Sequence, residues 1–202
     1  MPRHAASGRV IAGVDEAGRG PWAGPVVAAA VIPPRRKLGV RIDDSKRLTP
    51  RQRSLAYHII LEHSLVGVGI VPADVIDTDN IRQATLQAMQ DAVASLPSLP
   101  DLVLVDGNDP PALPMPCQAI SGGDHLSYAI ACASIVAKVT RDALMTFYHR
   151  FFPAYGFDRH KGYGTSVHAA ALSLHGPCFL HRVSFQPVKE KGRFYFSPPS
   201  AV

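Results

Sequence analysis

Short apolar runs alternate along the chain with longer segments of helical periodicity. Residues 9–14 and 25–32 are rich in valine, isoleucine and alanine, and a turn rich in glycine and proline separates them. Residues 64–71 and the run that ends at Asp106 have the same apolar character. Runs of this size that are bounded by turn residues and contain β-branched side chains predict buried strands.

Two segments between these runs have the period of a helix. Residues 49–63 begin with threonine and proline, which suit the N-cap and the first position of a helix. A second helix is predicted from Asp79-Asn80 to about Leu96, because the apolar side chains fall on one face and Pro97 ends the pattern.

The second half of the chain predicts its longest helix over residues 124–151, with small side chains suited to close packing on a sheet, and a shorter helix near 165–175. Strands and helices alternate, and no repeat or linker divides the chain. We therefore expect a single α/β domain over residues 1–202 with a covered central sheet. The ends, about residues 1–8 and 190–202, are expected to be mobile tails.

Composition narrows the class of protein. Of 202 residues, 47% are hydrophobic and 18% charged, which argues against a disordered chain. The net charge of +5 favours a polyanionic partner, although an ordinary soluble charge balance explains it equally well. The three scattered cysteines indicate neither a disulfide framework nor a zinc site. No apolar run is long enough to span a bilayer, so we expect a cytoplasmic protein without membrane contact.

Two of the predicted strands end in a carboxylate, Asp15 in the first and Asp106 in the fourth. If these strands are neighbours, their acids converge at one edge of the sheet, where ligands of open α/β sheets bind. Carboxylates brought together repel, and a hard cation such as Mg²⁺ relieves that repulsion. Each acid also has an ordinary interpretation: Glu16 as a solvated side chain, Asp106 as the start of a turn, and Asp124 as a helix N-cap.

The turn after the first acids contains Gly18, Gly20 and Gly24. Their spacing is one residue off the dinucleotide-binding fingerprint, and Pro21 would interrupt the helix which that fingerprint must open. No Gly-Lys-Ser/Thr sequence follows, so the turn is not a Walker loop either. The remaining interpretation is that the turn lets a ligand approach the backbone closely, since glycines leave backbone N–H and C=O groups uncovered.

Six motifs, in order along the chain, resemble one known family. They are DEAGRG at residues 15–20, DDSKRLT at 43–49, NIRQATLQAM at 80–89, LVDGN at 104–108, ASIVAKVTRD at 133–142 and HKGYGT at 160–165. Together they resemble type 2 ribonuclease H (ribonuclease HII), most closely its bacterial form. The resemblance runs from about residue 10 to residue 188.

The resemblance implies a ribonuclease H-like fold, a central mixed β-sheet flanked by helices, with a helical C-terminal portion. It implies a metal-dependent endoribonuclease that hydrolyses the RNA strand of RNA–DNA hybrids and cleaves 5′ of ribonucleotides embedded in duplex DNA. The products would carry 3′-hydroxyl and 5′-phosphate ends, and the cofactor would be Mg²⁺ or Mn²⁺ in a two-metal-ion mechanism. The role would be removal of ribonucleotides from DNA, by a monomer.

The resemblance also assigns roles to residues of this chain. The catalytic, metal-binding acids would be Asp15, Glu16, Asp106 and Asp124. The substrate-binding residues would be Gly18, Arg19 and Gly20 through their backbone at the 2′-hydroxyl, Tyr163 stacked on the next sugar, and Lys46, together with Arg47, at phosphates. Without the resemblance, Tyr163 could be a core tyrosine and Lys46 a solvated charge.

The chain departs from the family at Gly122, where many members have a lysine, so one phosphate-neutralising charge is expected to be missing. The histidines at 168, 175 and 181 lack the spacing of metal ligands and are expected to be structural or exposed.

Two other functions stay open: a nucleic-acid-binding protein without chemistry, and a metal-dependent hydrolase of small phosphorylated metabolites. The second would leave Tyr163 and the scattered basic residues unused.

Overall fold

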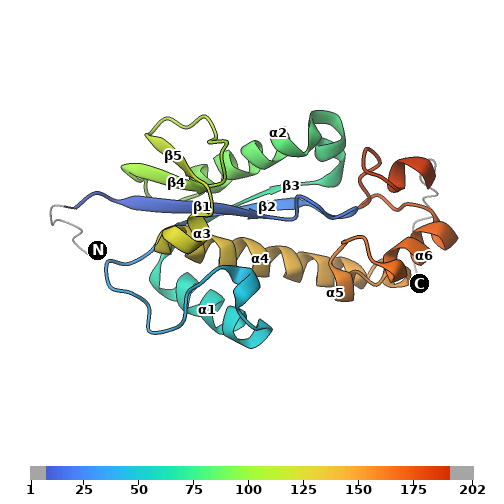
Figure 1. Ribbon diagram of the computed structural model, residues 1–202, viewed down its shortest axis with the longest axis horizontal. Coiled ribbons are helices and arrows are strands. Elements are labelled where there is room, and N and C mark those ends of the chain that lie inside the picture. The colour runs from blue at the N-terminus through green and yellow to red at the C-terminus, as the bar shows by residue number, and fades with distance from the viewer. Residues whose placement is uncertain (1–7, 192–202) are drawn as a thin grey trace.

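A five-stranded mixed sheet forms the centre of the protein in a computed structural model that describes residues 8–191 (Figure 1). The strand order is β3-β2-β1-β4-β5. The strands are β1 (Ile11–Ala17), β2 (Val26–Ile32), β3 (Leu65–Val71), β4 (Leu102–Asp106) and β5 (Cys117–Ile120). β1 pairs antiparallel with β2 and parallel with β4, so the sheet changes from antiparallel to parallel pairing at β1.

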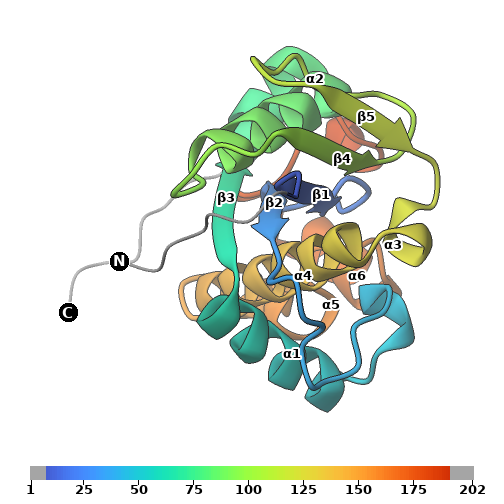
Figure 2. The ribbon, with the colours of Figure 1, turned by 90° about the vertical axis from the view of Figure 1, so that its left-hand side faces the viewer.

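Helices cover both faces of the sheet. The longer ones are α1 (Pro50–His63), α2 (Ala73–Ala94), α4 (Tyr128–His149) and α6 (Ser166–His175), and the short ones are α3 (Gly123–Leu126) and α5 (Phe157–His160). α2 lies on one face, while α4 and α1 lie on the other (Figures 1 and 2). α5 lies beside the C-terminal half of α4, and α6 lies farther out, beyond the end of the sheet (Figure 1).

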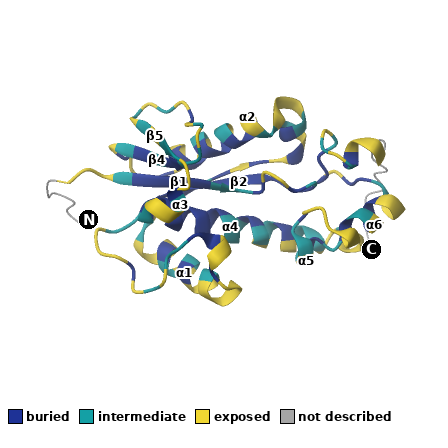
Figure 3. Cartoon of the chain, in the orientation of Figure 1, coloured by how far each residue is buried: buried dark blue, intermediate teal, exposed yellow. Residues whose placement is uncertain are grey.

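The core has two layers, one on each face of the sheet, and β1 and β2 are almost entirely buried between them (Figure 3). The chain allows α4 to approach β1 very closely at Gly13. A Cβ atom at Gly13 would lie 2.1 Å from the backbone carbon of Ala129, so only glycine fits there. This close packing brings α4 directly beneath the strand that carries Asp15.

Most of the predicted elements are present, with shifted boundaries. The helix after Thr49 begins at Pro50, and Thr49 closes a capping box with Gln52 as its sequence suggests. β1 extends to Ala17, so Asp15 lies inside the strand and the prediction that the strand ends at Asp15 was wrong. The hydrogen bonds to β2 continue the strand through the turn-like sequence.

The helix predicted from Asp79-Asn80 begins earlier, at Ala73, and bends at Asn80. Asn80 has a φ of 70°, and its side chain accepts hydrogen bonds from the N–H groups of Arg82 and Gln83. Asn80 thus caps the second half of α2, which explains why the sequence pattern placed a helix start there.

Three further boundaries differ from the prediction. The helix expected over residues 124–151 is divided into α3 and α4, because Ser127 adopts an extended conformation. β5 was not predicted at all. A 3₁₀ helix over Val188–Lys191 includes the first two residues of the expected C-terminal tail. Residues 1–7 and 192–202, in the predicted tails, lie outside the described residues. No helix between residues 8 and 191 is long and apolar enough to cross a membrane.

Candidate active site

Asp15 and Asp106 lie side by side on two parallel strands. The register pairs Val14 of β1 with Val105 of β4, so each acid follows directly after a paired residue. Side chains alternate along a strand, and both acids are on the face that packs against α3 and α4. The convergence expected from the two strand-end acids is therefore confirmed, because β1 and β4 are neighbours.

Asp124 completes a compact group of carboxylates. One oxygen from each of Asp15, Asp106 and Asp124 lies within 4.8 Å of the others, and we call these three residues the acid cluster. α3 brings Asp124 to β4, because the Gly123 N–H donates a 2.7 Å hydrogen bond to the Asp106 Oδ1. Asp124 makes no capping hydrogen bond to α3, whose N-cap is Gly122, so its interpretation as an N-cap was wrong.

Glu16 lies outside this compact group. Because it follows Asp15 in the strand, its side chain starts from the opposite face of β1. Its Oε1 lies 3.6 Å from the Nη1 of Arg19, which is a weak ion pair at the rim. The structure therefore brings three of the four expected acids into one compact group and places Glu16 beside Arg19. Glu16 is still close enough to interact, because burial and the charge of Asp106 raise its pKa, while Arg19 partly offsets the rise.

The acid cluster is held under electrostatic repulsion. Only 6% of Asp15 is exposed, and burial, together with the charges of Glu16 and Asp106, raises the pKa of Asp15 well above its usual value. Burial and then Asp106 also raise the pKa of Asp124. Between residues 8 and 191, neither Asp15 nor Asp106 has an ion-pair partner. Carboxylates collected without a cation are the ligand set that Mg²⁺ or Mn²⁺ prefers, so the site fits such an ion.

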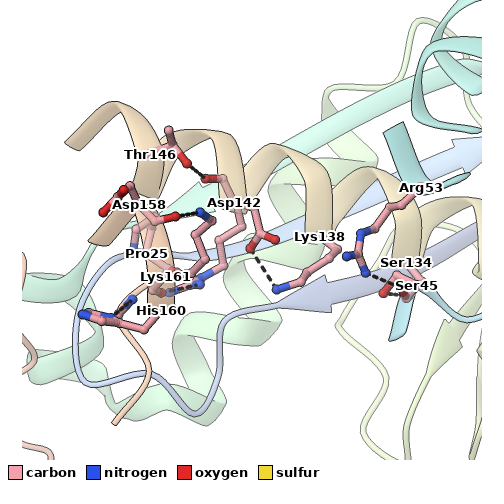
Figure 4. Close-up of polar contacts among 12 residues, drawn as sticks. Pro25, Ser45, Arg53, Ser134, Lys138, Asp142, Thr146, Asp158, His160 and Lys161 are labelled. Atoms are coloured by element: carbon pink, nitrogen blue, oxygen red, sulfur yellow. Dashed lines mark hydrogen bonds and ion pairs between the residues drawn. The ribbon is translucent and has the colours of Figure 1, made fainter. Parts of the chain in front are cut away.

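The segment with Lys46 lies against this site. Asp44 caps a 3₁₀ helix over Ser45–Arg47, and the Ser45 hydroxyl is 3.0 Å from the hydroxyl of Ser134 on α4 (Figure 4). The Lys46 side chain is exposed, and its positive charge partly offsets the rise in the pKa of Asp124. Lys46 is therefore near the acid cluster and open to solvent.

The turn at Gly18–Gly20 is held from behind by a buried arginine. Arg182 is fully buried, and its Nη2 and Nη1 donate hydrogen bonds of 2.6 and 2.8 Å to the carbonyl oxygens of Gly18 and Arg19. In a trans peptide the N–H points opposite to the C=O. The N–H groups of Arg19 and Gly20, which belong to the same two peptides, thus face away from Arg182. Neither donates a hydrogen bond to a described residue.

A second buried arginine ties this turn to the segment with Tyr163. Arg141 of α4 donates to the carbonyl oxygens of Pro25, Ala23 and Lys161 at 2.9, 3.1 and 3.0 Å. Figure 4 shows Pro25 and Lys161 beside α4. We call Arg141 and Arg182 the arginine pair. Burial lowers the pKa of both guanidinium groups, that of Arg182 to about 9.

Tyr163 projects from a tight turn between Gly162 and Gly164. The residue is 42% exposed, so it is not a core tyrosine. The Lys138 ammonium and the Arg141 guanidinium each lie 5.7 Å from the centre of its ring. The exposed ring that its flanking glycines suggested is therefore present, and basic groups surround it.

Sequence reasoning missed the arginine pair. Arg141 lies in a motif quoted for the resemblance, yet nothing in its spacing indicated burial. Arg182 contacts carbonyl groups 158 to 164 residues away in sequence, and backbone acceptors leave no trace in a sequence pattern. The expectation that His168 and His181 are structural holds, since both are buried, whereas His175 is exposed.

Comparisons with known proteins show the family of the chain. The Ribonuclease HII family profile matches residues 12–188. The Ribonuclease HII of Xanthobacter autotrophicus is 53% identical over 195 residues, which cover 96% of this chain and 78% of that protein.

Solved structures show the same fold at lower identity. The ribonuclease H2 from Pyrococcus horikoshii OT3 superposes with a TM-score of 0.76 at 24% identity, covering 89% of this chain and 95% of that one. Bst-RNase HIII in complex with Mn²⁺ gives a TM-score of 0.65 at 16% identity, covering 91% and 69%. The mixed sheet with helices on both faces is thus a ribonuclease H-like α/β fold. With the family profile covering most of its length and a curated relative above half identity, the chain belongs to the ribonuclease HII family of ribonuclease H endonucleases.

Proposed function

We propose that the protein is a metal-dependent endoribonuclease that cleaves 5′ of ribonucleotides embedded in duplex DNA and hydrolyses the RNA strand of RNA–DNA hybrids. The products would carry 3′-hydroxyl and 5′-phosphate ends, and the role would be removal of ribonucleotides from DNA. The observation that carries the proposal is one juxtaposition. Asp15 and Asp106 of the acid cluster have no ion-pair partner between residues 8 and 191, and Asp124 has only His125 at 3.9 Å. Three residues after Asp15 comes a turn whose Arg19 and Gly20 N–H groups face outward and donate to no described residue.

The acids would hold the metal. Asp15, Asp106 and Asp124 supply the compact oxygen set, and Glu16 would join them by leaving Arg19, a contact that at 3.6 Å costs little to break. Mg²⁺ or Mn²⁺ bound there would activate the attacking water and stabilise the leaving 3′-oxygen, as pairs of metal ions do in phosphodiester cleavage. A neighbouring structure, that of Bst-RNase HIII, contains Mn²⁺.

The turn at Gly18–Gly20 would distinguish RNA from DNA. A 2′-hydroxyl both donates and accepts hydrogen bonds, and it is the group that separates the two nucleic acids. The outward N–H groups of Arg19 and Gly20 offer donors to its oxygen, while Arg182 prevents the peptides from turning over. Gly20 leaves room for the sugar, because a Cβ atom there would meet nothing within 4 Å.

Tyr163 and the basic side chains would orient the duplex. The exposed Tyr163 ring offers a flat surface for the sugar that follows the ribonucleotide, and a 2′-hydroxyl on that sugar would collide with it. Lys46, with Lys138 near Tyr163, would neutralise phosphates and fix the register without reading sequence. With Gly122 in place of the family's lysine, Lys46 would carry more of this phosphate contact.

One cleavage assay tests the proposal against its two competitors. All-DNA, single-ribonucleotide and RNA–DNA hybrid duplexes are incubated with Mg²⁺, with Mn²⁺ and with EDTA, and the product ends are mapped. We expect metal-dependent cleavage of the two ribonucleotide-containing duplexes, with 5′-phosphate ends at the ribonucleotide. Binding without cleavage would indicate a binding protein, and hydrolysis of small phosphate esters alone would indicate a metabolite hydrolase. Light scattering of the active species tests the expected monomer.

A further inference from the structure

Three histidines lie in contact behind the turn that carries Tyr163. The rings of His160 and His168 stack with their centres 4.5 Å apart, and the Nε2 of His168 is 3.0 Å from the Nε2 of His181. His168 and His181 are 0% and 1% exposed. Buried imidazoles are polar groups that must find partners inside the protein. The proposed chemistry at the acid cluster uses none of them.

The hydrogen bonds of His168 and His181 run in one direction. The His181 Nδ1 is 3.0 Å from the Cys178 N–H, which can only donate, and 3.3 Å from the Cys178 carbonyl oxygen, which already accepts the His181 backbone N–H at 2.9 Å. The shorter contact assigns Nδ1 as the acceptor and puts the proton of His181 on its Nε2. The His181 Nε2–H must then donate to the His168 Nε2, which leaves the proton of His168 on Nδ1. That Nδ1–H donates to the carbonyl oxygen of Tyr163 at 2.9 Å. The chain of donors therefore ends on the backbone of Tyr163.

Both imidazole rings must be uncharged for this series of hydrogen bonds to form. A second proton on His168 would place two N–H groups against each other at 3.0 Å, and a second proton on His181 would face the Cys178 N–H. Burial, followed by the neighbouring histidines, lowers the pKa of His168 to about 4 and that of His181 to about 3. The other titratable groups that pack against the pair are His160 of α5, Tyr155 and Cys178. The chain therefore persists throughout the neutral range.

His168 also joins the two turns that the proposed function uses. Its ring packs on the ring of Trp22, with the centres 5.3 Å apart. The Trp22 N–H in turn donates to the carbonyl oxygen of Gly162 at 2.9 Å. Trp22 follows closely after the turn at Gly18–Gly20, and Gly162 precedes Tyr163. His168 is thus packed at the point where the two turns meet.

We infer that His168 is a positioning residue for ribonucleotide recognition, which holds the backbone of Tyr163 while His181 fixes the tautomer that makes this possible. The inference rests on the proposed role of Tyr163. Its mechanism is specific: the Tyr163 carbonyl accepts the Thr165 N–H at 2.9 Å, and the Nδ1–H of residue 168 is a second donor that fixes this peptide, so the exposed ring keeps one orientation towards the sugar. If residue 168 only filled space, its effect on ribonucleotide recognition would not depend on which ring nitrogen carries the proton.

The tautomers can be measured directly in the native protein. In a long-range proton–nitrogen correlation spectrum of ¹⁵N-histidine-labelled protein at pH 7, His168 should be neutral with its proton on Nδ1. His181 should be neutral with its proton on Nε2. If His168 is charged, or carries its proton on Nε2, the donor to Tyr163 does not exist and the inference is overturned.

Two substitutions separate positioning from packing. In His168→Asn the amide nitrogen reaches about the Nδ1 position and can still donate to the Tyr163 carbonyl, whereas in His168→Gln it reaches about the Nε2 position. The readout is kcat/KM for a single-ribonucleotide duplex divided by kcat/KM for an RNA–DNA hybrid. We expect the Asn variant to keep this ratio within about twofold. The Gln variant should lower the ratio about tenfold, a change that corresponds to about 1.4 kcal/mol. The lowered ratio should approach that of Tyr163→Ala. His175→Gln, an exposed change on the same helix, is the matched control.

The outcomes are distinguishable from those that test the function itself. If the wild-type protein cleaves no ribonucleotide-containing duplex, the proposed function fails. If it cleaves, but the Asn and Gln variants shift the ratio equally, His168 acts only through packing and the inference fails. Added in the Tyr163→Ala background, neither His168 substitution should change the ratio further, and an additional change there would also contradict the inference. Thermal unfolding of each variant identifies any loss of the fold.

Discussion

The acid cluster and the arginine pair are both buried charge, and the protein holds them in opposite ways. Arg141 and Arg182 donate at least seven hydrogen bonds to backbone carbonyl oxygens, so nearly every part of each guanidinium is satisfied internally. The acids face each other, and the pKa of Asp15 is raised by burial and by its acidic neighbours. One region is complete in itself, and the other requires something from outside.

This difference separates the part of the site that binds from the part that supports. A buried charge without a partner costs free energy, and such a cost is typical of positions where a ligand completes the structure. The arginine pair instead donates hydrogen bonds to the carbonyl oxygens of the turns at Gly18–Gly20 and Lys161. These bonds fix the direction in which the remaining backbone groups of the turns point. Removing an acid and removing an arginine should therefore have opposite effects on stability.

The largest effect is expected for Asp106→Asn. Losing one metal-binding charge should reduce cleavage about a thousandfold or more, or about 4 kcal/mol in the barrier. The fold should survive, because the asparagine oxygen can still accept the Gly123 N–H. Without metal the variant should be more stable than the wild type by about 1 kcal/mol, since repulsion within the acid cluster is relieved. Urea unfolding in EDTA and single-turnover cleavage measure the two effects. Wild-type cleavage rates, or a lower stability in EDTA, would contradict the comparison.

Arg182→Lys should have the opposite signature. Lysine keeps the charge but cannot reproduce the planar fork that contacts Gly18, Arg19 and Gly24. Hydrogen bonds from charged groups contribute about 1.5–3 kcal/mol each, so we expect a loss of roughly 3 kcal/mol. For a chain of this size that loss lowers the Tm by about 10 °C.

The exposed Arg51 on α1 provides the matched control for Arg182, since Arg51→Lys should change stability by less than about 0.5 kcal/mol. Addition of Mg²⁺ should raise the Tm of the wild type and of Arg182→Lys alike, because the acids remain. If Arg182→Lys unfolds at the wild-type temperature, the arginine pair is not the support that its hydrogen bonds indicate.

The sequence anticipated the acid cluster much better than the arginine pair, for a physical reason. A buried strand has a strong local pattern, and an acid where that pattern stops is conspicuous at Asp15 and Asp106. That these two strands are parallel neighbours was a condition of that prediction, and it is the strand order of the structure that meets it. The role of Glu16 stays a prediction: β1 continues past the acids, so its side chain starts from the opposite face of the strand from Asp15.

Elements stabilised by distant contacts were not predictable. β5 spans only Cys117–Ile120 after a segment with four prolines, and it exists because β4 offers a parallel edge. The break between α3 and α4 at Ser127 lies within a continuous helical pattern, and it swings Asp124 towards β4. In each case tertiary contacts decide the local structure, and a single sequence does not reveal them.

Gly18→Ala and Gly20→Ala provide the finest test, because the two glycines belong to one turn but should differ in role. Gly18 should behave as part of the supporting region, and Gly20 as part of the binding region. Gly18 has a φ of 97°, and a Cβ atom there would lie 1.9 Å from the Arg141 Nε. We expect Gly18→Ala to lower stability by about 2 kcal/mol or more, by disturbing the arginine pair. At Gly20 the added methyl meets only solvent, so stability should be unchanged or higher by up to about 1 kcal/mol.

Gly20→Ala should still impair cleavage, because its methyl group enters the space that the ribose of the substrate would occupy. We expect kcat/KM on a single-ribonucleotide duplex to fall about tenfold, or 1.4 kcal/mol, while the Mg²⁺ affinity measured by calorimetry stays within about twofold. A stable Gly20→Ala enzyme with full activity would mean that substrate does not approach this turn. Equal destabilisation by both substitutions would mean that the turn is support throughout, and the division between binding and supporting regions would then have to be drawn closer to the acid cluster.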